Sequence, residues 1–216
     1  MSKKTKEFDV YWGKLLGSAK VYLMGASDKQ LRVQLFDVLH QFFHDSSCWT
    51  EAIRFTVIPE TLDYPLYTTQ GRILRLDAVL DQHNTRQQAV MPDIGTVSFL
   101  YPYTQTQPMT AIVIKTVTDP LMCFPPNIPD WILPKHGIVI LHGLIGSMMM
   151  LPAQSYTNPQ MAQFYLGKFN DGISGAMVAA TKMNTMGAQT WAFPQSHRTS
   201  SQRGGISTYN VHPQPR

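Results

Sequence analysis

The stretch from Asn158 to Met183 constrains the fold of this chain most, because its pattern is that of one long amphipathic helix. Asn158 followed by Pro159 is typical of a helix start, since the asparagine side chain can accept a backbone N–H and proline needs no N–H partner there. Behind this start, apolar and small residues recur at steps of three and four, on one helix face. They are Met161, Tyr165, Phe169, Gly172, Ile173, Ala176, Met177, Ala180 and Met183.

The second half of this predicted helix carries very small side chains. They belong to Gly172, Gly175, Ala176, Ala179 and Ala180. So little bulk allows another helix to approach closely, from the same chain or from a neighbouring one. Glycine within a helix costs about 1 kcal/mol relative to alanine, so we expect close packing to compensate for it.

The composition favours a protein that makes contacts with other subunits. The chain has 216 residues, which suggests one domain or one domain with an insertion. Only 15% of the residues are charged, compared with about 25% in typical soluble domains, and such a surface suits subunit contacts. The formal net charge of +4 comes from scattered residues, apart from Lys3, Lys4 and Lys6. A dedicated nucleic-acid binder usually has a denser basic stripe.

The sequence suggests neither a membrane span nor a secretion signal. The longest apolar candidate runs from Ile138 to Leu151 and is interrupted by His142, two glycines and Ser147, so it falls short of the ~18 apolar residues of a span. The first residues lack the apolar run of a signal peptide. Cys48 and Cys123 have no CxxC or Cys/His metal spacing, and we expect buried thiols. We expect an intracellular, soluble protein that binds no membrane.

The first part of the chain is predicted to be helical. The first 20 residues carry a short apolar cluster between Val10 and Leu16, which indicates a helical arm of one or two turns. Ser27 and Gln30 have the spacing of a capping box, and apolar residues follow at helical steps. We therefore predict a helix from Asp28 to about His44.

The period changes to two after Ser46, which predicts β-strands. The predicted strands are Ile53–Val57, Gly71–Leu80, Thr96–Tyr101 and Met109–Val117. Turn residues separate them. Together they predict a small antiparallel β-module inserted between helices.

The chain then returns to helices through a proline-rich connector that runs from Pro120 to Pro134. A helix is expected from Ile138 to Leu151, and the long helix follows. Beyond Gly187 the residues lose periodicity, no acidic residue follows Asp171, and a few apolar residues could anchor this tail on a partner. The predicted segments are 1–48, an arm and helix; 49–121, the β-module; 122–186, the connector and C-terminal helices; and 187–216, a docking tail. The fold class is α+β, with a helical layer of three to four helices, the inserted small antiparallel β-module and an extended C-terminal tail.

Several sequence motifs suggest chemistry, and each has a structural interpretation that we favour. The HGLIGS motif at His142–Ser147 lies inside a helical pattern, whereas a phosphate cradle needs a strand, a turn and then a helix. His44 to Ser47 holds the side chains of a serine triad, but a triad needs groups that converge from separate segments. We interpret these residues as a helix C-terminus, where His44 favours the negative end of the dipole.

No motif indicates a cofactor or metal. The histidines are isolated from one another and from acidic residues, and neither HExxH nor HxH is present. The acidic residues are scattered and mostly lie beside turn residues, so paired carboxylates for acid–base catalysis are hard to find. We predict no catalytic, cofactor-binding or metal-binding residues and a chain that is not an enzyme.

The order of these elements resembles the head-to-tail connector (adaptor) proteins of tailed bacteriophages. The resemblance covers roughly Val10 to Pro194 and rests on collinear features. These are the first helix, the segment DSSCWTE leading into a strand, Tyr64-Pro-Leu, GRILRLDAV, the proline-rich return, a helix and the stretch NPQMAQFYLGKFNDGISGAMVAAT. In the long helix, Tyr165, Phe169, Gly172 and Ala176 match the aromatic, glycine and alanine series of that family.

The resemblance implies a structural, non-enzymatic virion protein in the neck between capsid and tail, made in the host cytoplasm. The family forms a ring, commonly of twelve subunits, between the portal protein and a tail, nozzle or tail-tube protein. DNA passes through the ring lumen without sequence-specific binding. The helices would form the ring wall, with Gly172, Gly175, Ala176, Ala179 and Ala180 at the subunit interface. The tail would bind the portal through Trp191, Phe193, Pro194 and Tyr209.

Two alternatives remain open at this point. One is another neck or tail ring, such as a stopper or a tail terminator, which would engage a different partner. The other is a small serine hydrolase that uses Ser147 or the His44 to Ser47 cluster.

Overall fold

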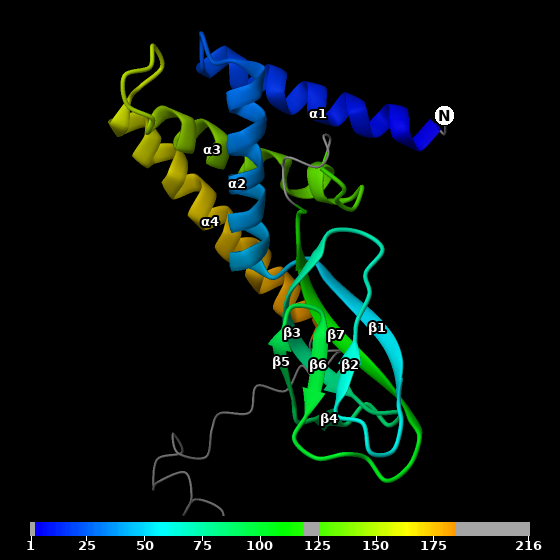
Figure 1. Cartoon of the computed structure of the whole chain (residues 1–216). Coiled ribbons are helices and arrows are strands. Elements are labelled where there is room, and N and C mark those ends of the chain that lie inside the picture. The colour runs from blue at the N-terminus through cyan, green and yellow to red at the C-terminus, as the bar shows by residue number, and fades with distance from the viewer. Residues whose placement is uncertain (1–2, 119–125, 185–216) are drawn as a thin grey trace, which may run out of the picture. The chain divides into compact units, whose positions relative to one another are not determined.

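The computed structural model describes residues 3–118 and 126–184, and shows a mixed α+β fold (Figure 1). The described helices are α1 (Lys3–Tyr22), α2 (Asp28–Ser46), α3 (Ile132–Met149) and α4 (Pro159–Asn184). The strands are β1 (Thr50–Val57), β2 (Asp63–Pro65), β3 (Arg72–Leu80), β4 (Arg86–Gln87), β5 (Ala89–Asp93), β6 (Thr96–Phe99) and β7 (Gln107–Thr116). Residues Met1–Thr181 form one compact unit. Mixed α+β class and antiparallel pairing are thus confirmed.

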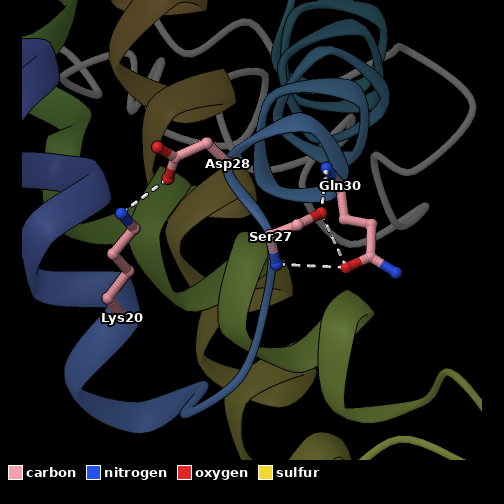
Figure 2. Close-up of polar contacts among 4 residues, drawn as sticks. All are labelled: Lys20, Ser27, Asp28 and Gln30. Atoms are coloured by element: carbon pink, nitrogen blue, oxygen red, sulfur yellow. Dashed lines mark hydrogen bonds and ion pairs between the residues drawn. The ribbon is translucent and has the colours of Figure 1, made fainter.

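Helix α2 begins where the sequence predicts, and for the predicted reason. The Oγ of Ser27 accepts a hydrogen bond from the backbone N–H of Gln30 at 3.3 Å, and Gln30 Oε1 accepts one from the backbone N–H of Ser27 at 3.1 Å (Figure 2). This reciprocal pair is a capping box. Figure 2 also shows Lys20 of α1 paired with Asp28 at 2.6 Å. The lysine lowers the pKa of that carboxyl, chiefly through the hydrogen bond.

Helix α1 is much longer than the one or two turns that the sequence predicts. It spans 20 residues, and Trp12, Leu15 and Ala19 are all buried along one side. These residues follow helical steps of three and four, so one face packs continuously into the core. The prediction missed this length because glycines, lysines and serine interrupt the apolar pattern.

The strands form two antiparallel sheets, of order β1-β7-β3-β4 and β2-β6-β5. Strand β7 is central in the first sheet, and its register with β1 runs from Thr50 opposite Ile114 to Val57 opposite Gln107. Strands β3, β6 and β7 lie close to their predicted ranges, whereas β1 begins three residues earlier than Ile53. Strands β2, β4 and β5 were not predicted. They are short, and prolines within β2 and β5 argue against strand from sequence alone.

Two apolar clusters stabilise this part of the chain. One fills the space between the helices, and its largest fully buried side chains include Trp12, Phe42, Phe43 and Phe169. The other lies on the sheets, where the ring of Phe99 packs against Tyr64 and Tyr103 with centroid distances of 5.8 and 5.0 Å.

Helix α3 starts at Ile132, six residues before the predicted start. Pro134 therefore lies in its first turn, where the missing N–H costs little, and not in an extended connector. The helix has 18 residues with a hydropathy of 1.3, so by length and composition it could cross a membrane, contrary to the expectation that no stretch qualifies. However, 56% of this 18-residue segment is buried inside the protein. Buried core helices of soluble proteins can also be this long and this apolar.

Helix α4 confirms the predicted start at Pro159. The Oδ1 of Asn158 accepts a hydrogen bond from the backbone N–H of Met161 at 3.1 Å, which is the predicted cap. Ala162, Phe169, Ile173 and Ala176 are buried along one side of the helix. The helix therefore buries one stripe and leaves the opposite side exposed.

Candidate interaction surfaces

Helices α3 and α4 approach each other so closely that glycine is required at the contact. A β-carbon on Gly146 of α3 would lie 2.8 Å from the side chain of Leu166 and 3.0 Å from its backbone nitrogen. A β-carbon on Gly172 of α4 would lie 2.5 Å from Val139 of α3. Contacts this short do not occur between real atoms, so larger residues at these positions would push the helices apart.

The contact residues also fix the direction in which the two helices cross. A β-carbon on Gly143 of α3 would lie 2.8 Å from the ring of Phe169 on α4 and 2.7 Å from the side chain of Val38 on α2. Residues 139, 143 and 146 of α3 contact residues 172, 169 and 166 of α4, respectively, so the residue numbers rise along one helix and fall along the other. The two helices therefore pack antiparallel, with α2 contacting α3 at the same level.

The predicted small face of α4 divides into two parts. Gly172 contacts Val139, and Ala176 is buried, so both residues make contacts inside the chain. Gly175 is exposed, and a β-carbon on it would meet no atom within 4 Å. Ala179 and Ala180 are half-buried. Periodicity places these residues on a helix but does not separate the side that α3 covers from the side left open.

The HGLIGS motif lies wholly inside α3, as the helical pattern indicates. Its two glycines are the contact points for α4, and its histidine packs against Tyr165 of α4 with a ring centroid distance of 5.7 Å. The motif is therefore a helix-packing element. Its glycines were visible in the sequence, but their pairing with residues on α4 needed the structure.

Trp49 joins the helices to the first sheet. The indole is 4% exposed and packs against Phe43 of α2 at a centroid distance of 5.1 Å. The Nζ of Lys115 on β7 lies 4.9 Å from the centre of the indole ring and 2.5 Å from Glu51 Oε2. The backbone oxygen of Trp49 accepts a hydrogen bond from the N–H of Lys115 at 2.8 Å. A nearly buried lysine thus has both a carboxylate and an aromatic face as partners.

Gly71 allows this junction to close. Its φ is +63°, a conformation that favours glycine, and a β-carbon there would lie 2.5 Å from both the Trp49 ring and the backbone oxygen of Thr116. The turn before β3 therefore packs directly on the indole. A side chain at this position would displace either the ring or the strand.

The His44 to Ser47 cluster forms a helix C-terminus, as the sequence predicts. Ser47 is the C-cap residue in a left-handed conformation, and its N–H bonds to the oxygen of Phe43. His44 Nδ1 contacts Asp45 Oδ1 at 2.8 Å, whereas the Oγ of Ser47 accepts a hydrogen bond from Arg75 at 2.6 Å. The hydroxyl of Ser46 is buried and accepts the N–H of Cys48. These contacts pair each serine with a group other than His44.

The remaining reactive groups gather in no obvious site within the described residues. No three His, Cys, Asp or Glu side chains in residues 3–118 and 126–184 lie close enough together to hold a metal ion. Burial raises the pKa of the Cys48 thiol, which makes its thiolate scarce at neutral pH. Cys123 lies outside the described residues.

The grooves on the surface of the described unit include two open troughs. One, of about 410 Å³, lies between β3 and the β4–β5 segment and includes Arg75, Asp77, Arg86 and Val90. The other, of about 260 Å³, lies between α1 and α3. Both are open troughs and not enclosed pockets, and this shape suits a segment of protein better than a small molecule.

Trp191, Phe193, Pro194 and Tyr209, the predicted portal anchors, lie outside the described residues. Neither a protein-family model nor a curated protein matches the chain.

The α3–α4 contact predicts opposite effects for glycines on the two sides of these helices. Gly146→Ala should destabilise the protein by about 1–3 kcal/mol, because the new methyl group overpacks against Leu166. Gly137→Ala on the same helix meets open space and should be neutral or stabilise by up to about 1 kcal/mol. Urea denaturation of both variants measures this difference. Equal effects would show that the contact is not tight.

Two histidines of α3, one buried and one half-buried, predict a loss of stability in mild acid. Burial lowers the pKa of His136 and of His142 from the ordinary value of 6.5, so the unfolded state binds more protons once the pH falls below that value. Stability should be greatest above about pH 7 and decline toward pH 5, before most carboxylates titrate. Thermal unfolding across this range should show a weaker decline in His136→Leu. An unchanged slope in that variant would contradict the assignment to His136.

Proposed function

We propose that this chain is a structural subunit of a ring that joins a bacteriophage capsid portal to the tail and lets DNA pass. The observation that carries the proposal is the collinear order of elements. Helix α2 ends just before Trp49, Thr50 and Glu51 open the strands, and the long helix α4 carries Tyr165, Phe169, Gly172 and Ala176. This order is the one that resembles head-to-tail connectors.

In this proposal the four helices form a helical layer that makes the ring wall. The two sheets form the inserted β-module and extend toward the next component, a tail, nozzle or tail-tube protein. Residues 187–216 form an extended tail that reaches the portal, with Trp191, Phe193, Pro194 and Tyr209 as anchors. Twelve subunits close the ring, in the neck of a virion assembled in the host cytoplasm.

The charge distribution supports a passive channel for DNA. The formal net charge is only +4, and a binder that neutralises many phosphates needs a denser set of lysines and arginines. A lumen without a basic stripe lets DNA slide through without sequence-specific binding. The ring needs no cofactor.

The contacts at the candidate nucleophiles support a structural protein over an enzyme. Ser47 accepts its hydrogen bond from Arg75, and Ser46 is buried. Ser147 lies half-buried inside α3. Labelling of any of these serines by a broad serine-reactive probe would contradict the non-enzymatic assignment.

Binding to purified portal rings tests the proposal. The full chain should be a monomer or weak oligomer on its own and should form a closed ring on the portal, because binding of the tail to the portal contributes to ring formation. Removal of residues 187–216 should abolish binding, and the triple variant Trp191→Ala, Phe193→Ala, Tyr209→Ala should weaken it strongly. Native mass measurement detects the ring.

A matched control changes polar residues of the same tail. Thr199→Ala with Ser200→Ala and Ser201→Ala should bind the portal normally. Unchanged portal binding after truncation would contradict the role of the tail. Binding to tail rings but not to the portal would instead indicate a stopper or tail terminator.

A further inference from the structure

Helix α4 has an exposed stripe of apolar and small residues, with one aspartate, on the side that faces away from α3. Phe164 and Val178 are 56% and 53% exposed, although both are large apolar residues. Gly167, Asp171 and Gly175 lie between them and are also exposed. The five residues follow each other at steps of three and four, the spacing of a seam that packs along another helix. We call this set the α4 seam.

The space above the α4 seam is open. A β-carbon on Gly167 or Gly175 would meet no heavy atom within 4 Å, in contrast to Gly172 on the covered side. Two glycines one turn on either side of Asp171 would let a second helix approach closely. Within the described unit, the seam is therefore an uncovered helix face with the carboxylate of Asp171 at its centre. At one end of the seam, the Nζ of Lys168 on the same helix lies 5.8 Å from the centre of the Phe164 ring.

The groove between α1 and α3 has complementary properties. Its volume is about 260 Å³, and its lining includes the apolar side chains of Tyr11, Ile138 and Leu141. Ile138 is 73% exposed. Lys14 and Lys135 also line the groove, and none of its lining residues is acidic. The groove thus offers an apolar floor with positive charges, to which an apolar helix with a central carboxylate is complementary.

The α4 seam and this groove lie on different sides of the helical part. Val139, Gly143 and Gly146 of α3 face α4, whereas Ile138 and Leu141 of the same helix line the groove. Because successive residues of a helix point about 100° apart, the groove opens on another side of α3 than the one that α4 covers. One chain can therefore use both surfaces at once, each toward a different copy.

We propose that the α4 seam of one copy docks into the α1–α3 groove of a second copy, with Asp171 placed between Lys14 and Lys135. This inference depends on the ring of the proposed function and names the two faces that build it. Phe164 and Val178 cover apolar surface of the groove, and the seam glycines permit close contact. Contact between two different faces is heterologous, and repeated rotation of such a contact closes a ring.

Cross-linking tests this docking on the full chain bound to portal rings. In a background with Cys48→Ala and Cys123→Ala, the pair Ser18→Cys and Gly167→Cys places one thiol in the groove and one on the seam. A flexible bis-maleimide should then produce a ladder of dimers, trimers and higher species, because each copy is linked on two sides. The matched control pairs Ser18→Cys with Asn170→Cys, which is exposed on α4 outside the seam. It should give little ladder.

Charge reversal tests the pairing at the centre of the interface. Asp171→Lys should reduce the ladder about tenfold, since it places like charges together. Lys14→Glu with Lys135→Glu should do the same, and combining all three changes should restore the ladder. A restored ladder distinguishes a direct pairing from three unrelated losses of stability.

The outcomes separate this docking from the proposed function. Suppose that native mass measurement detects the ring. The docking would then be overturned, and the ring would stand, if cross-linking gave no ladder, gave dimers only, or gave a ladder equal to that of the control. A cross-link from the groove to the portal would also overturn it, because a partner would then occupy the groove. Absence of both ring and ladder would overturn the docking together with the proposed function.

Discussion

The close antiparallel contact between α3 and α4 is the constraint on which the helical part depends. Gly146 and Gly172 remove the side chains that would otherwise hold these helices apart. Helix α3 in turn contacts α1 and α2, so its position determines where the other helices lie. Without the short approach at these glycines, Phe169 could not fill the space next to Val38, and the buried cluster between the helices would open.

A second junction connects this helical part to the strands. Trp49 belongs to the helical cluster through Phe43, yet its backbone and ring contact Lys115 of the central strand β7. Removing Glu51 would leave the ammonium of Lys115, whose side chain is 3% exposed, without its carboxylate partner. The junction therefore combines apolar packing with a buried ion pair.

Sequence patterns predicted those elements whose local signals are strong. The capping box at Ser27 and the Asn158 cap located two helix starts, because both signals lie within three residues and depend on local hydrogen bonds. The predicted start of α3 was wrong because a proline such as Pro134 indicates extended chain, unless it is known to lie in the first turn of a helix. Strand β5 was missed because Pro92 lies within it, and only pairing with β6 makes it a strand.

The candidate interface illustrates the same limit. The sequence locates small residues on a long helix, but Gly172 and Gly175 are only three residues apart and face different surroundings. Which glycine is covered depends on Val139, a residue far away in the chain. The surface proposed for contact with a neighbour therefore shifts from the whole small face to the stripe from Phe164 to Val178.

A cryo-electron microscopy reconstruction of the full chain bound to portal rings would show whether the copies form a ring and which surfaces they share. We expect a closed ring of copies against the portal, in which α4 of each copy lies along α1 and α3 of the next. A reconstruction with isolated copies around the portal, or with a ring in which neighbouring copies meet through other surfaces, would contradict it.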